Sequence, residues 1–508
     1  MGAIVLIGFM GAGKSAALAA ARKQGLETTE IDEMMERELG KPIKRAFEED
    51  GEEAFRAREA EIVGSLLQGA DGGVIALGGG SVLSERVREA LDRHIVVLLE
   101  VDAATAWERI KGTDRPLARS EADVERLLAE RSPLYEELAD VVVPMVDKEA
   151  VGRTLSWVEA VRRLPDGTRM LWATSKSGAY PIVIGRGILG SQWWPMEGRQ
   201  FVVCDPNTRE YLDGALRPAA EPVELPEAGE TAKTLGAVRE VLEELTEKGM
   251  TRKDYLVAFG GGVVGDTAGL CAHLYQRGVP VVQVPTTLMA QVDSAYGGKT
   301  GVDLPKVKNY VGAYHQPAAV IVDIEALDTL PQEELAAGFV EVLKTGLLEG
   351  GELWERARKL EKIVPAELGE IIFECARFKC EVVAEDERDE ERRHILNFGH
   401  TVGHAIEAAT QYKRYKHGEA VGLGLLAALE LSGRDDLRDE VEAILRRHGL
   451  PVRLDPDVEV EQVLTALERD KKSTPDGVRF VLLPKPGDPR PGEAVDPAKV
   501  KAAVENLY

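Results

Sequence analysis

The sequence has few cysteines for its length, and none of them form a recognisable pair. Its 508 residues contain four, Cys204, Cys271, Cys375 and Cys380, with no CxxC spacing. A long chain of this kind is typical of a reducing compartment. We therefore expect reduced, mostly buried thiols and a cytoplasmic location, and we expect neither a disulfide framework nor a cysteine-rich zinc site.

Long apolar runs and excess positive charge are also missing. No run reaches the roughly 18 apolar residues of a membrane span, and the apolar start of the chain lacks the basic region and cleavage site of a signal peptide. The 63 Lys and Arg stand against 87 Asp and Glu, a net charge of −24. This balance argues against nucleic acid or an anionic membrane as partner. Local clusters of Arg and Lys must then bind any anionic substrate.

Two separate α/β patterns follow one another along the chain. The first has short apolar runs at residues 3–7, 74–77 and 95–99, a helical segment at about 150–163, and the turn sequence PDGT at 165–168. The second begins near residue 170, with strands expected at 180–184 and 201–204, and becomes almost wholly helical from residue 332 until a short strand at 478–483. We expect domains at residues 1–163, 173–325 and 326–508, with a linker at 164–172.

A phosphate-binding loop lies at residues 8–15, where GFMGAGKS fits GxxxxGK[ST] directly after an expected strand. Backbone amides of such a loop, at a helix N-terminus, bind phosphate oxygens. Lys14 is expected to reach the β- and γ-phosphates and Ser15 to hold Mg²⁺. The predicted ATP contacts are Gly11, Ala12, Gly13, Lys14, Ser15 and Ala16.

Residues 1 to about 160 resemble shikimate kinase, because the segments around EIDEMMERELGKPI, GEEAFRAREAE, the glycine triplet, DRPL and ERSPLYEELA match that family in order. The resemblance implies a P-loop kinase α/β/α sandwich. It also implies roles: Asp32 for the shikimate hydroxyls, Arg56 and Arg131 for the carboxylate, Gly78, Gly79 and Gly80 for the acceptor pocket, and Arg115 as a lid near the transferred phosphate. A gluconate-type kinase would share the loop but not the two carboxylate-binding arginines. Glu30 replaces the first Asp of the family's Asp-x-Asp, which bears on the geometry of Mg²⁺.

Three of the eight histidines, His400, His404 and His417, fall within eighteen residues. A catalytic zinc site needs about three N or O protein ligands and an open position, so the cluster indicates a metal enzyme. His400 and His404, at i and i+4, share one helical face, and their spacing allows both to chelate one ion. The alternative is a helix with histidines on its solvated face.

A second glycine-rich turn, in YLVAFGGGVVGD at 255–266, follows an expected strand and suits the approach of a pyrophosphate. The spacing of its glycines is not GxGxxG, so this turn alone is weak evidence for dinucleotide binding. QVPTTLMAQVDSAYGGKTGVD at 283–303, KNYVGAYHQP at 308–317, DTLP at 328–331, GFVEVLKTG at 338–346 and the histidine segment follow it. Together these motifs resemble 3-dehydroquinate synthase from about residue 170 to the end. The resemblance implies a Rossmann-like α/β domain and then a mostly α-helical metal- and substrate-binding domain.

The same resemblance implies the site residues. Glu341, His400 and His417 match ligands of Zn²⁺ or Co²⁺, and His404 faces the substrate. Expected NAD contacts are Asp205, Asn207, Glu230, Lys233, Gly261, Gly262, Val263, Asp266, Thr286, Thr287, Asp293, Lys299, Lys308, Asn309, Thr329 and Leu330. Expected catalytic or substrate-binding residues are Asp293, Lys299, Lys308, Asn309, Lys344, Lys379, Arg393, Asn397, His404 and Lys471 or Lys472. Arg277 matches an arginine that reaches a neighbouring subunit's substrate, which implies a homodimer.

The expected function is therefore bifunctional. One part would phosphorylate shikimate with ATP and Mg²⁺, and the other would convert 3-deoxy-arabino-heptulosonate 7-phosphate to 3-dehydroquinate and phosphate by an NAD-dependent, metal-assisted elimination. Two alternatives remain: a related sugar-phosphate cyclase or polyol dehydrogenase in the second part, and a non-catalytic nucleotide-binding module in the first. Leu270, where the family usually has Phe, is expected to be a core change without effect on the chemistry.

Overall fold

The structure, a computed structural model, describes residues 2–113, 118, 120–144, 150–191, 193–305, 307–471 and 478–508, without the side chains of 150–153, 191 and 469–471. The described chain forms two compact units. One contains Met1–Ala173, Pro181–Val183 and Trp193–Met196, and the other contains Thr174–Tyr180, Ile184–Gln192 and Glu197–Tyr508. No helix of the described part is both long and apolar enough to cross a bilayer.

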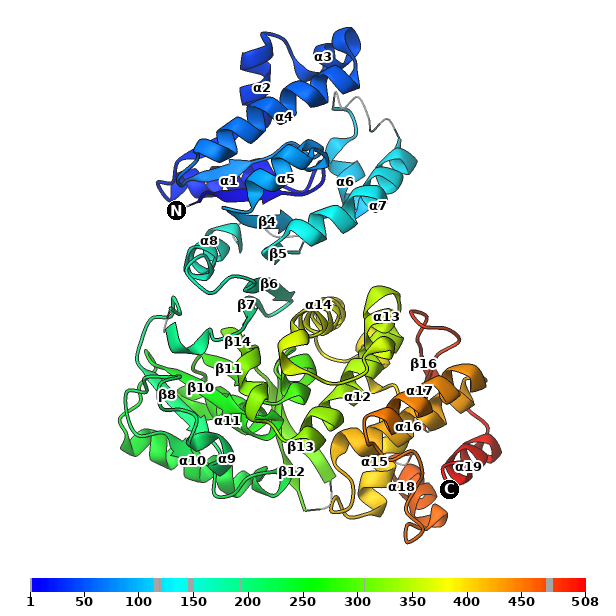
Figure 1. The fold of residues 1–508 in the computed structure, drawn as a ribbon. Coiled ribbons are helices and arrows are strands. Elements are labelled where there is room, and N and C mark those ends of the chain that lie inside the picture. The colour runs from blue at the N-terminus through cyan, green and yellow to red at the C-terminus, as the bar shows by residue number, and fades with distance from the viewer. Residues whose placement is uncertain are drawn as a thin grey trace. The chain divides into compact units, whose positions relative to one another are not determined.

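The first unit is a parallel sheet in the order β2-β3-β1-β4-β5-β6 with helices around it (Figure 1). The central strand β1 pairs with both neighbours through Ile4, whose partners are Val74 and Ile95. These strands are continuous apolar runs because helices cover both faces of such a sheet. The strands are β1 (Ile4–Ile7), β2 (Thr28–Glu30), β3 (Val74–Ala76), β4 (Ile95–Leu99), β5 (Val141–Val143) and β6 (Arg169–Ser175). The helices are α1 (Lys14–Lys23), α2 (Ile31–Leu39), α3 (Ile43–Asp50), α4 (Glu52–Gly69), α5 (Glu85–Leu91), α6 (Ala103–Ile110), α7 (Glu121–Leu138) and α8 (Ala150–Val161), with the 3₁₀ turn η1 (Ser81–Leu83).

The segment expected as a linker is partly strand. Residues 165–168 form a turn, in which the amide of Thr168 donates to the carbonyl of Pro165. Strand β6 then begins at Arg169 and pairs in parallel with β5, with Met170 opposite Val141. The apolar side chains at 170–173 are buried, which explains why this segment adds a strand to a sheet instead of remaining solvated. Strand β7 (Gly178–Gly185) follows β6, and both strands contain residues of the two units.

The second unit combines a parallel sheet, in the order β14-β11-β10-β8-β9, with a helical part. Its strands are β8 (Gln200–Cys204), β9 (Val223–Glu224), β10 (Tyr255–Gly260), β11 (Val281–Pro285), β14 (Ala319–Asp323), the antiparallel pair β12 (Lys299–Leu304) and β13 (Val307–Tyr314), and the pair β15 (Phe480–Leu482) and β16 (Arg490–Glu493). Its helices are α9 (Pro206–Arg209), α10 (Leu235–Glu247), α11 (Gly262–Leu274), α12 (Gln332–Glu349), α13 (Gly351–Lys359), α14 (Gly369–Glu385), α15 (His400–Ala409), α16 (His417–Leu431), α17 (Asp435–Arg447), α18 (Val460–Lys471) and α19 (Pro497–Glu505). Shorter turns are η2 (Leu189–Ser191), η3 (Glu230–Ala232), η4 (Tyr275–Arg277), the π-helical η5 (Ala290–Ser294), η6 (Ile324–Thr329), η7 (Pro365–Glu367) and η8 (Arg392–Asn397).

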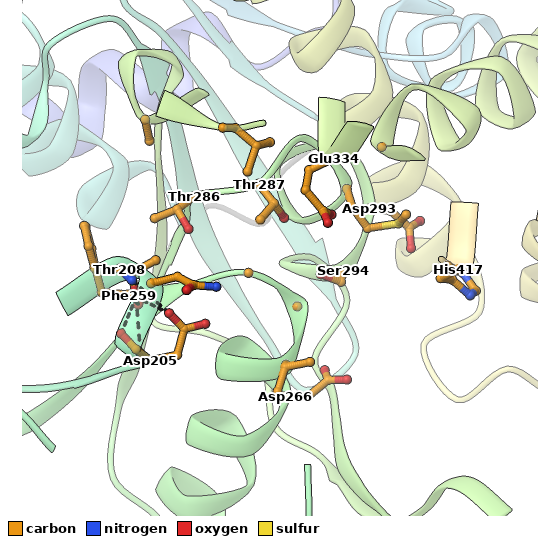
Figure 2. Close-up of a pocket in the computed structure, with 18 of the residues that line it drawn as sticks. Asp205, Thr208, Phe259, Asp266, Thr286, Thr287, Asp293, Ser294, Glu334 and His417 are labelled. Carbon is orange, nitrogen blue, oxygen red and sulfur yellow. Dashed lines mark hydrogen bonds between the residues drawn. The ribbon is translucent and has the colours of Figure 1, made fainter. Parts of the chain in front are cut away.

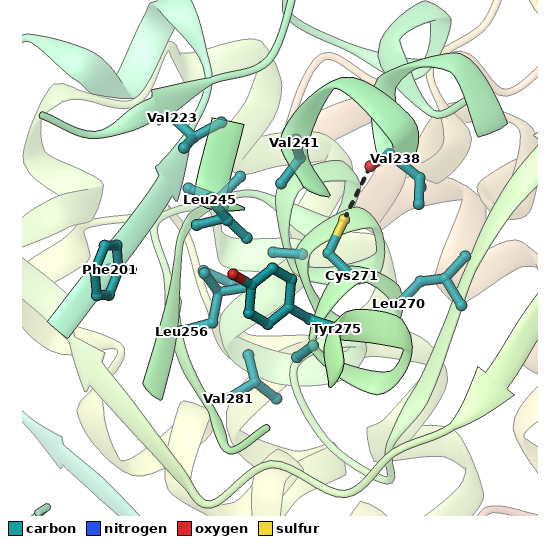
Figure 3. Packing of buried hydrophobic residues seen from close by; sticks show 14 of the residues in the cluster. Phe201, Val223, Val238, Val241, Leu245, Leu256, Leu270, Cys271, Tyr275 and Val281 are labelled. Carbon is teal, nitrogen blue, oxygen red and sulfur yellow. Dashed lines mark hydrogen bonds between the residues drawn. The ribbon is translucent and has the colours of Figure 1, made fainter. Parts of the chain in front are cut away.

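A buried apolar cluster fixes α10 and α11 against the sheet of the second unit (Figure 3). Phe201 and Leu256 come from neighbouring strands, and Val238 and Leu270 come from the two helices. Leu270, which stands where the family usually has Phe, is 3% exposed. It belongs to this core, as expected from the sequence. The packing holds the start of α11 at the carboxyl end of β10, the edge where parallel sheets bind ligands.

Candidate active sites

The phosphate loop of the first unit joins β1 to α1, at the centre of the sheet. Lys14 Nζ donates to the carbonyl oxygens of Gly8 and Phe9, at 2.6 and 3.0 Å, which closes the loop. Ser15 Oγ donates to Glu30 Oε1 at 2.5 Å. The side chain of Glu30, one methylene longer than Asp, therefore places its carboxylate directly at the hydroxyl expected to bind Mg²⁺.

The glycine triplet of the first unit is surrounded by the expected acceptor-binding residues. A Cβ at Gly80 would lie 2.4 Å from Arg56 Nη2, and one at Gly78 would lie 3.1 Å from Asp32 Oδ1. Arg131, only 4% exposed, donates to the carbonyl of Gly79. The structure thus brings Asp32, Arg56 and Arg131 to one turn, although they come from three different helices.

Several neighbours of these residues were not predicted from the sequence. Glu59 pairs with Arg56 at 2.6 Å and accepts from Ser81 Oγ at 2.8 Å. Tyr135 Oη donates to the carbonyl of Gly79, and burial raises the pKa of its phenol. Arg109 of α6 donates to the carbonyl of Gly11 at 2.8 Å, beside the phosphate loop. The i, i+3 spacing of Arg56 and Glu59 could have indicated their ion pair from the sequence. Arg115 lies outside the described residues.

The second unit contains a cavity of about 1760 Å³, larger than a typical small-ligand pocket of roughly 300–1,000 Å³. All the expected NAD contacts except Lys308 line it. Figure 2 shows Asp205 and Thr208 at one end of the cavity and His417 at the other, with Thr287 and Asp293 between them. The cavity therefore has room for a dinucleotide and a second ligand.

The nucleotide end of the cavity is built from strand ends and a helix start. Asp205 follows β8 and caps α9 by accepting from the Thr208 amide at 2.9 Å. Gly261 and Gly262 begin α11 after β10, where a Cβ would lie 3.0 Å from Thr287 Cγ2 and 3.0 Å from Ser294 Oγ respectively. Glycine at both positions keeps the helix N-terminus open to a phosphate. These residues fit a dinucleotide.

The opposite end brings Glu341 of α12 to two histidines. Glu341 Oε1 lies 3.5 Å from His400 Nε2 and 3.6 Å from His417 Nε2. Ligands of a tetrahedral zinc ion, at about 2.0–2.2 Å from it, lie roughly 3.3–3.6 Å apart. Glu341 is fully buried; its Oε2 is paired with Lys344 Nζ at 2.6 Å, and its Oε1 faces the two histidines. Such an arrangement fits a divalent cation.

His404 offers a second way of completing the histidine pair. Single ligand atoms of His400, His404 and His417 all lie within 4.8 Å of one another. His404 is exposed and lines the cavity, whereas Glu341 is buried beneath it. Glu341 Oε1 faces Nε2 of both His400 and His417, and Lys344 compensates the charge at its other oxygen. His404 is thus placed as the residue facing a ligand in the cavity.

In both histidines beside Glu341, the second ring nitrogen, Nδ1, lies close to a hydrogen-bond acceptor. His400 Nδ1 lies 3.3 Å from the carbonyl oxygen of Phe398, and His417 Nδ1 lies 3.3 Å from Glu407 Oε2. Burial lowers the pKa of His400 to about 3. Burial also opposes protonation of His417, but Glu341 and Glu407 outweigh it and raise its pKa to about 9. Glu407 was not predicted from the sequence, although its i, i+4, i+7 spacing from His400 and His404 could have indicated it.

A chain of alternating charges runs from the buried Glu341 to Asp293 and Lys379 in the cavity lining. Lys344 Nζ lies 2.6 Å from Glu341 Oε2 and 3.8 Å from Asp293 Oδ1, and Lys379 Nζ lies 2.9 Å from the same Asp293 oxygen. Burial raises the pKa of Asp293, but Lys379 and Lys344 outweigh it and bring the value to about 2. Burial lowers the pKa of Lys379. The two lysines therefore compensate an ionised Asp293.

The remaining expected residues divide into three groups. Lys299, Lys379, Arg393, Asn397 and His404 line the cavity, and Arg393 is held by the carbonyl oxygens of Glu387 and Gly297 at 2.7 and 3.1 Å. Lys308 and Lys344 lie behind its wall. Arg277, exposed on η4, lies away from the cavity of its own chain. Lys472 and the side chain of Lys471 lie outside the described residues.

Comparison with known families gives three matches. The shikimate kinase family matches residues 10–160, and the N-terminal and C-terminal parts of 3-dehydroquinate synthase match residues 223–337 and 338–473. The 3-dehydroquinate synthase of Solibacter usitatus is 40% identical over 326 residues, which cover 61% of this chain and 91% of that protein. The chain belongs to the 3-dehydroquinate synthase family. It also carries a shikimate kinase domain, so the bifunctional interpretation of the sequence is confirmed.

Solved structures similar to the dehydroquinate synthase part include two synthases with different names. A 2-deoxy-scyllo-inosose synthase complexed with carbaglucose-6-phosphate, NAD⁺ and Co²⁺ has a TM-score of 0.59 and 25% identity, over 67% of this chain and 100% of that chain. The 2-epi-5-epi-valiolone synthase of Streptomyces hygroscopicus subsp. jinggangensis, with NAD⁺ and Zn²⁺ bound, has a TM-score of 0.57 and 26% identity, over 66% and 98%. The identity of 40% to a dehydroquinate synthase favours that activity over those of these two synthases.

Proposed function

We propose that the second unit converts 3-deoxy-arabino-heptulosonate 7-phosphate to 3-dehydroquinate and phosphate with NAD⁺ and Zn²⁺ or Co²⁺. The observation that carries this proposal is Glu341 Oε1, buried and facing His400 Nε2 and His417 Nε2 at 3.5 and 3.6 Å, in one cavity with a dinucleotide-type glycine turn. Glu341, His400 and His417 would hold the cation. The bound NAD⁺ would supply a reversible hydride acceptor, and the cation would supply a Lewis acid.

The residues of the cavity suit a substrate with two anionic groups. Arg393, which two backbone carbonyls hold in place, presents a planar guanidinium suited to a carboxylate. Lys299, at the cavity wall, pairs with Asp389. Lys379, whose pKa burial lowers, presents its amine to the cavity beside Asp293, at 2.9 Å from Oδ1. His404 and Asn397 complete the polar wall on the cation side.

We further propose that the first unit transfers phosphate from ATP to the 3-hydroxyl of shikimate with Mg²⁺. Lys14 and the loop amides would bind the β- and γ-phosphates, and Ser15 with Glu30 would position the ion. Arg56 and Arg131 would bind the carboxylate of shikimate, and Asp32 its hydroxyls. The contact between Ser15 and Glu30 argues against a non-catalytic module, because it keeps a carboxylate at the expected Mg²⁺ position.

Assembly as a homodimer through the second unit is part of the same proposal. Arg277 is exposed on η4 and does not line the cavity of its own chain, so a substrate contact requires another subunit. A cytoplasmic location stays a prediction from the sequence.

A paired assay of one preparation tests the proposal. The purified chain should form shikimate 3-phosphate from shikimate and ATP, and should release phosphate from the heptulosonate phosphate. Metal analysis should give about one Zn²⁺ or Co²⁺ per chain. Release of phosphate from other heptulose phosphates but not from this one would indicate a different cyclase, and absence of kinase activity would indicate a non-catalytic first unit.

A further inference from the structure

A buried carboxylate, Glu407, lies behind His417 and outside the cavity lining. It is 2% exposed, and its Oε2 lies 3.3 Å from His417 Nδ1. The other ring nitrogen of His417, Nε2, faces Glu341 Oε1 at 3.6 Å. Because an ionised carboxylate can only accept, Glu407 favours a proton on Nδ1, which would leave the Nε2 lone pair for a cation bound between His417 and Glu341.

The second oxygen of Glu407 is held by a lysine from the other part of the second unit. Glu407 Oε1 lies 3.2 Å from Lys308 Nζ of β13. Lys308 Nζ also lies 3.4 Å from Glu230 Oε1 of η3, and 4.7 Å from the centre of the Tyr412 ring. A buried carboxylate needs such a cation, because it is costly to bury a charge alone. Lys308 therefore holds one oxygen of Glu407, so that the other is directed toward His417.

We propose that Glu407 is a positioning residue that orients His417 for the divalent cation. The proposal rests on the proposed function, because it assigns His417 to the cation site. Metal-binding histidines commonly donate their second nitrogen to a carboxylate or a carbonyl, and the loss of that partner weakens metal binding. The carbonyl oxygen of Phe398 is the corresponding acceptor for His400, at 3.3 Å from its Nδ1. Both imidazoles thus have an acceptor at Nδ1 and turn Nε2 toward Glu341.

A simple structural role is the competing explanation. Glu407 could serve only to tie the β12–β13 hairpin to α15 through Lys308. A variant that merely loosened the hairpin would lower stability and leave the affinity for the cation alone. Metal affinity, measured on the full chain without substrate, therefore separates the two roles.

The test compares Glu407→Gln with Glu442→Gln. Glu442 of α17 is also a helical, ion-paired carboxylate, 2.6 Å from Arg446, but its ion-pair partners are arginines and not a histidine. Zinc is titrated into each metal-free full-length protein in competition with a chromogenic chelator. Glu407→Gln should raise the Kd for zinc by about 10- to 100-fold, whereas Glu442→Gln should keep it within about twofold of wild type. A folded Glu407→Gln protein with the wild-type Kd would overturn the proposal.

Bound Co²⁺ gives a second readout that does not depend on activity. At saturating Co²⁺, the visible absorption bands of Glu407→Gln should shift from those of wild type, because His417 is no longer held in one orientation, and those of Glu442→Gln should not. Identical spectra in all three proteins would count against the proposal. If Glu407→Gln does not fold, Glu407→Asp takes its place, and its shorter side chain should still weaken zinc binding. A wild-type protein that binds no zinc would refute the proposed synthase function itself.

Discussion

His417 reaches Glu341 because Gly418 allows helix α16 to lie directly on α12. His417 Nε2 and Glu341 Oε1 are 3.6 Å apart, and a Cβ at Gly418 would lie only 2.0 Å from the carbonyl oxygen of Ala337. The proposed cation site thus depends on close backbone packing next to one of its ligands.

Gly418→Ala should weaken both the fold and the cation site. The added methyl has to push α16 away from α12, and overpacking of this kind costs about 1–3 kcal/mol. We expect a lower free energy of unfolding in urea and a weaker affinity for zinc. Gly422→Ala on the same helix is the matched control, since its Cβ would meet only side-chain atoms of Leu445 and Val340, at 3.4 Å or more. Equal effects of the two substitutions would show that close packing at Gly418 is not specifically required for the cation site.

The two active sites should fail independently. Lys14→Ala removes the amine that binds the carbonyls of Gly8 and Phe9, and should abolish shikimate phosphorylation while phosphate release by the synthase continues. His417→Ala should do the reverse. Both reactions are assayed on each variant. Loss of both activities from either substitution would contradict two separate sites.

Gly80→Ala should impair shikimate binding selectively. Its Cβ would lie 2.4 Å from Arg56 Nη2, so the guanidinium has to move. Loss of a charge-assisted hydrogen bond costs about 1.5–3 kcal/mol, which corresponds to a rise in the KM for shikimate of at least about tenfold. The KM for ATP should stay the same. Gly69→Ala, where the added Cβ would have open space, is the control. Equal rises in both KM values would point to general misfolding.

The first unit should lose stability in mild acid because of His94, the only histidine among residues 1–173. His94 Nδ1 accepts from the Ala3 amide, Nε2 donates to the Leu67 carbonyl, and burial lowers its pKa below the ordinary 6.5. When the pH falls below 6.5, the unfolded chain binds a proton that the folded chain does not, so this contribution to stability is complete above that pH and declines below it. Hydrogen exchange of the β1 and β4 amides between pH 7.5 and 5.5 measures the effect. His94→Asn should flatten this dependence, and an unchanged slope would refute the assignment.

Arg277 should act across a subunit boundary. Arg277→Ala and His417→Ala should each abolish synthase activity. A mixture of the two, unfolded and refolded together, should recover about a quarter of the wild-type activity, because half of the dimers are mixed and each contains one intact site. No recovery from a dimeric mixture, or full activity of a monomeric species, would contradict this arrangement.

Much of the fold could be predicted from local patterns. The continuous apolar runs at Ile4–Ile7 and Ile95–Leu99 are buried parallel strands, and the phosphate loop follows the first of them as expected. The segment at Arg169–Ser175 was harder to assign, because a short apolar stretch after a turn does not reveal which sheet it will join. The partners of the site residues were missed for a similar reason: Glu407 meets Lys308, and Arg109 meets Gly11, from distant parts of the chain.

The sequence by itself determined the chemistry available: a loop that binds phosphate, a glycine turn that suits a dinucleotide, and three clustered histidines. These signals are local, because helical and strand periods fix which side chains share a face. Only the tertiary structure decided that Glu341, from another helix, lies between His400 and His417 and that Asp293 joins two lysines. Contacts between distant segments depend on how closely backbones pack, as at Gly418, and no local pattern encodes that distance.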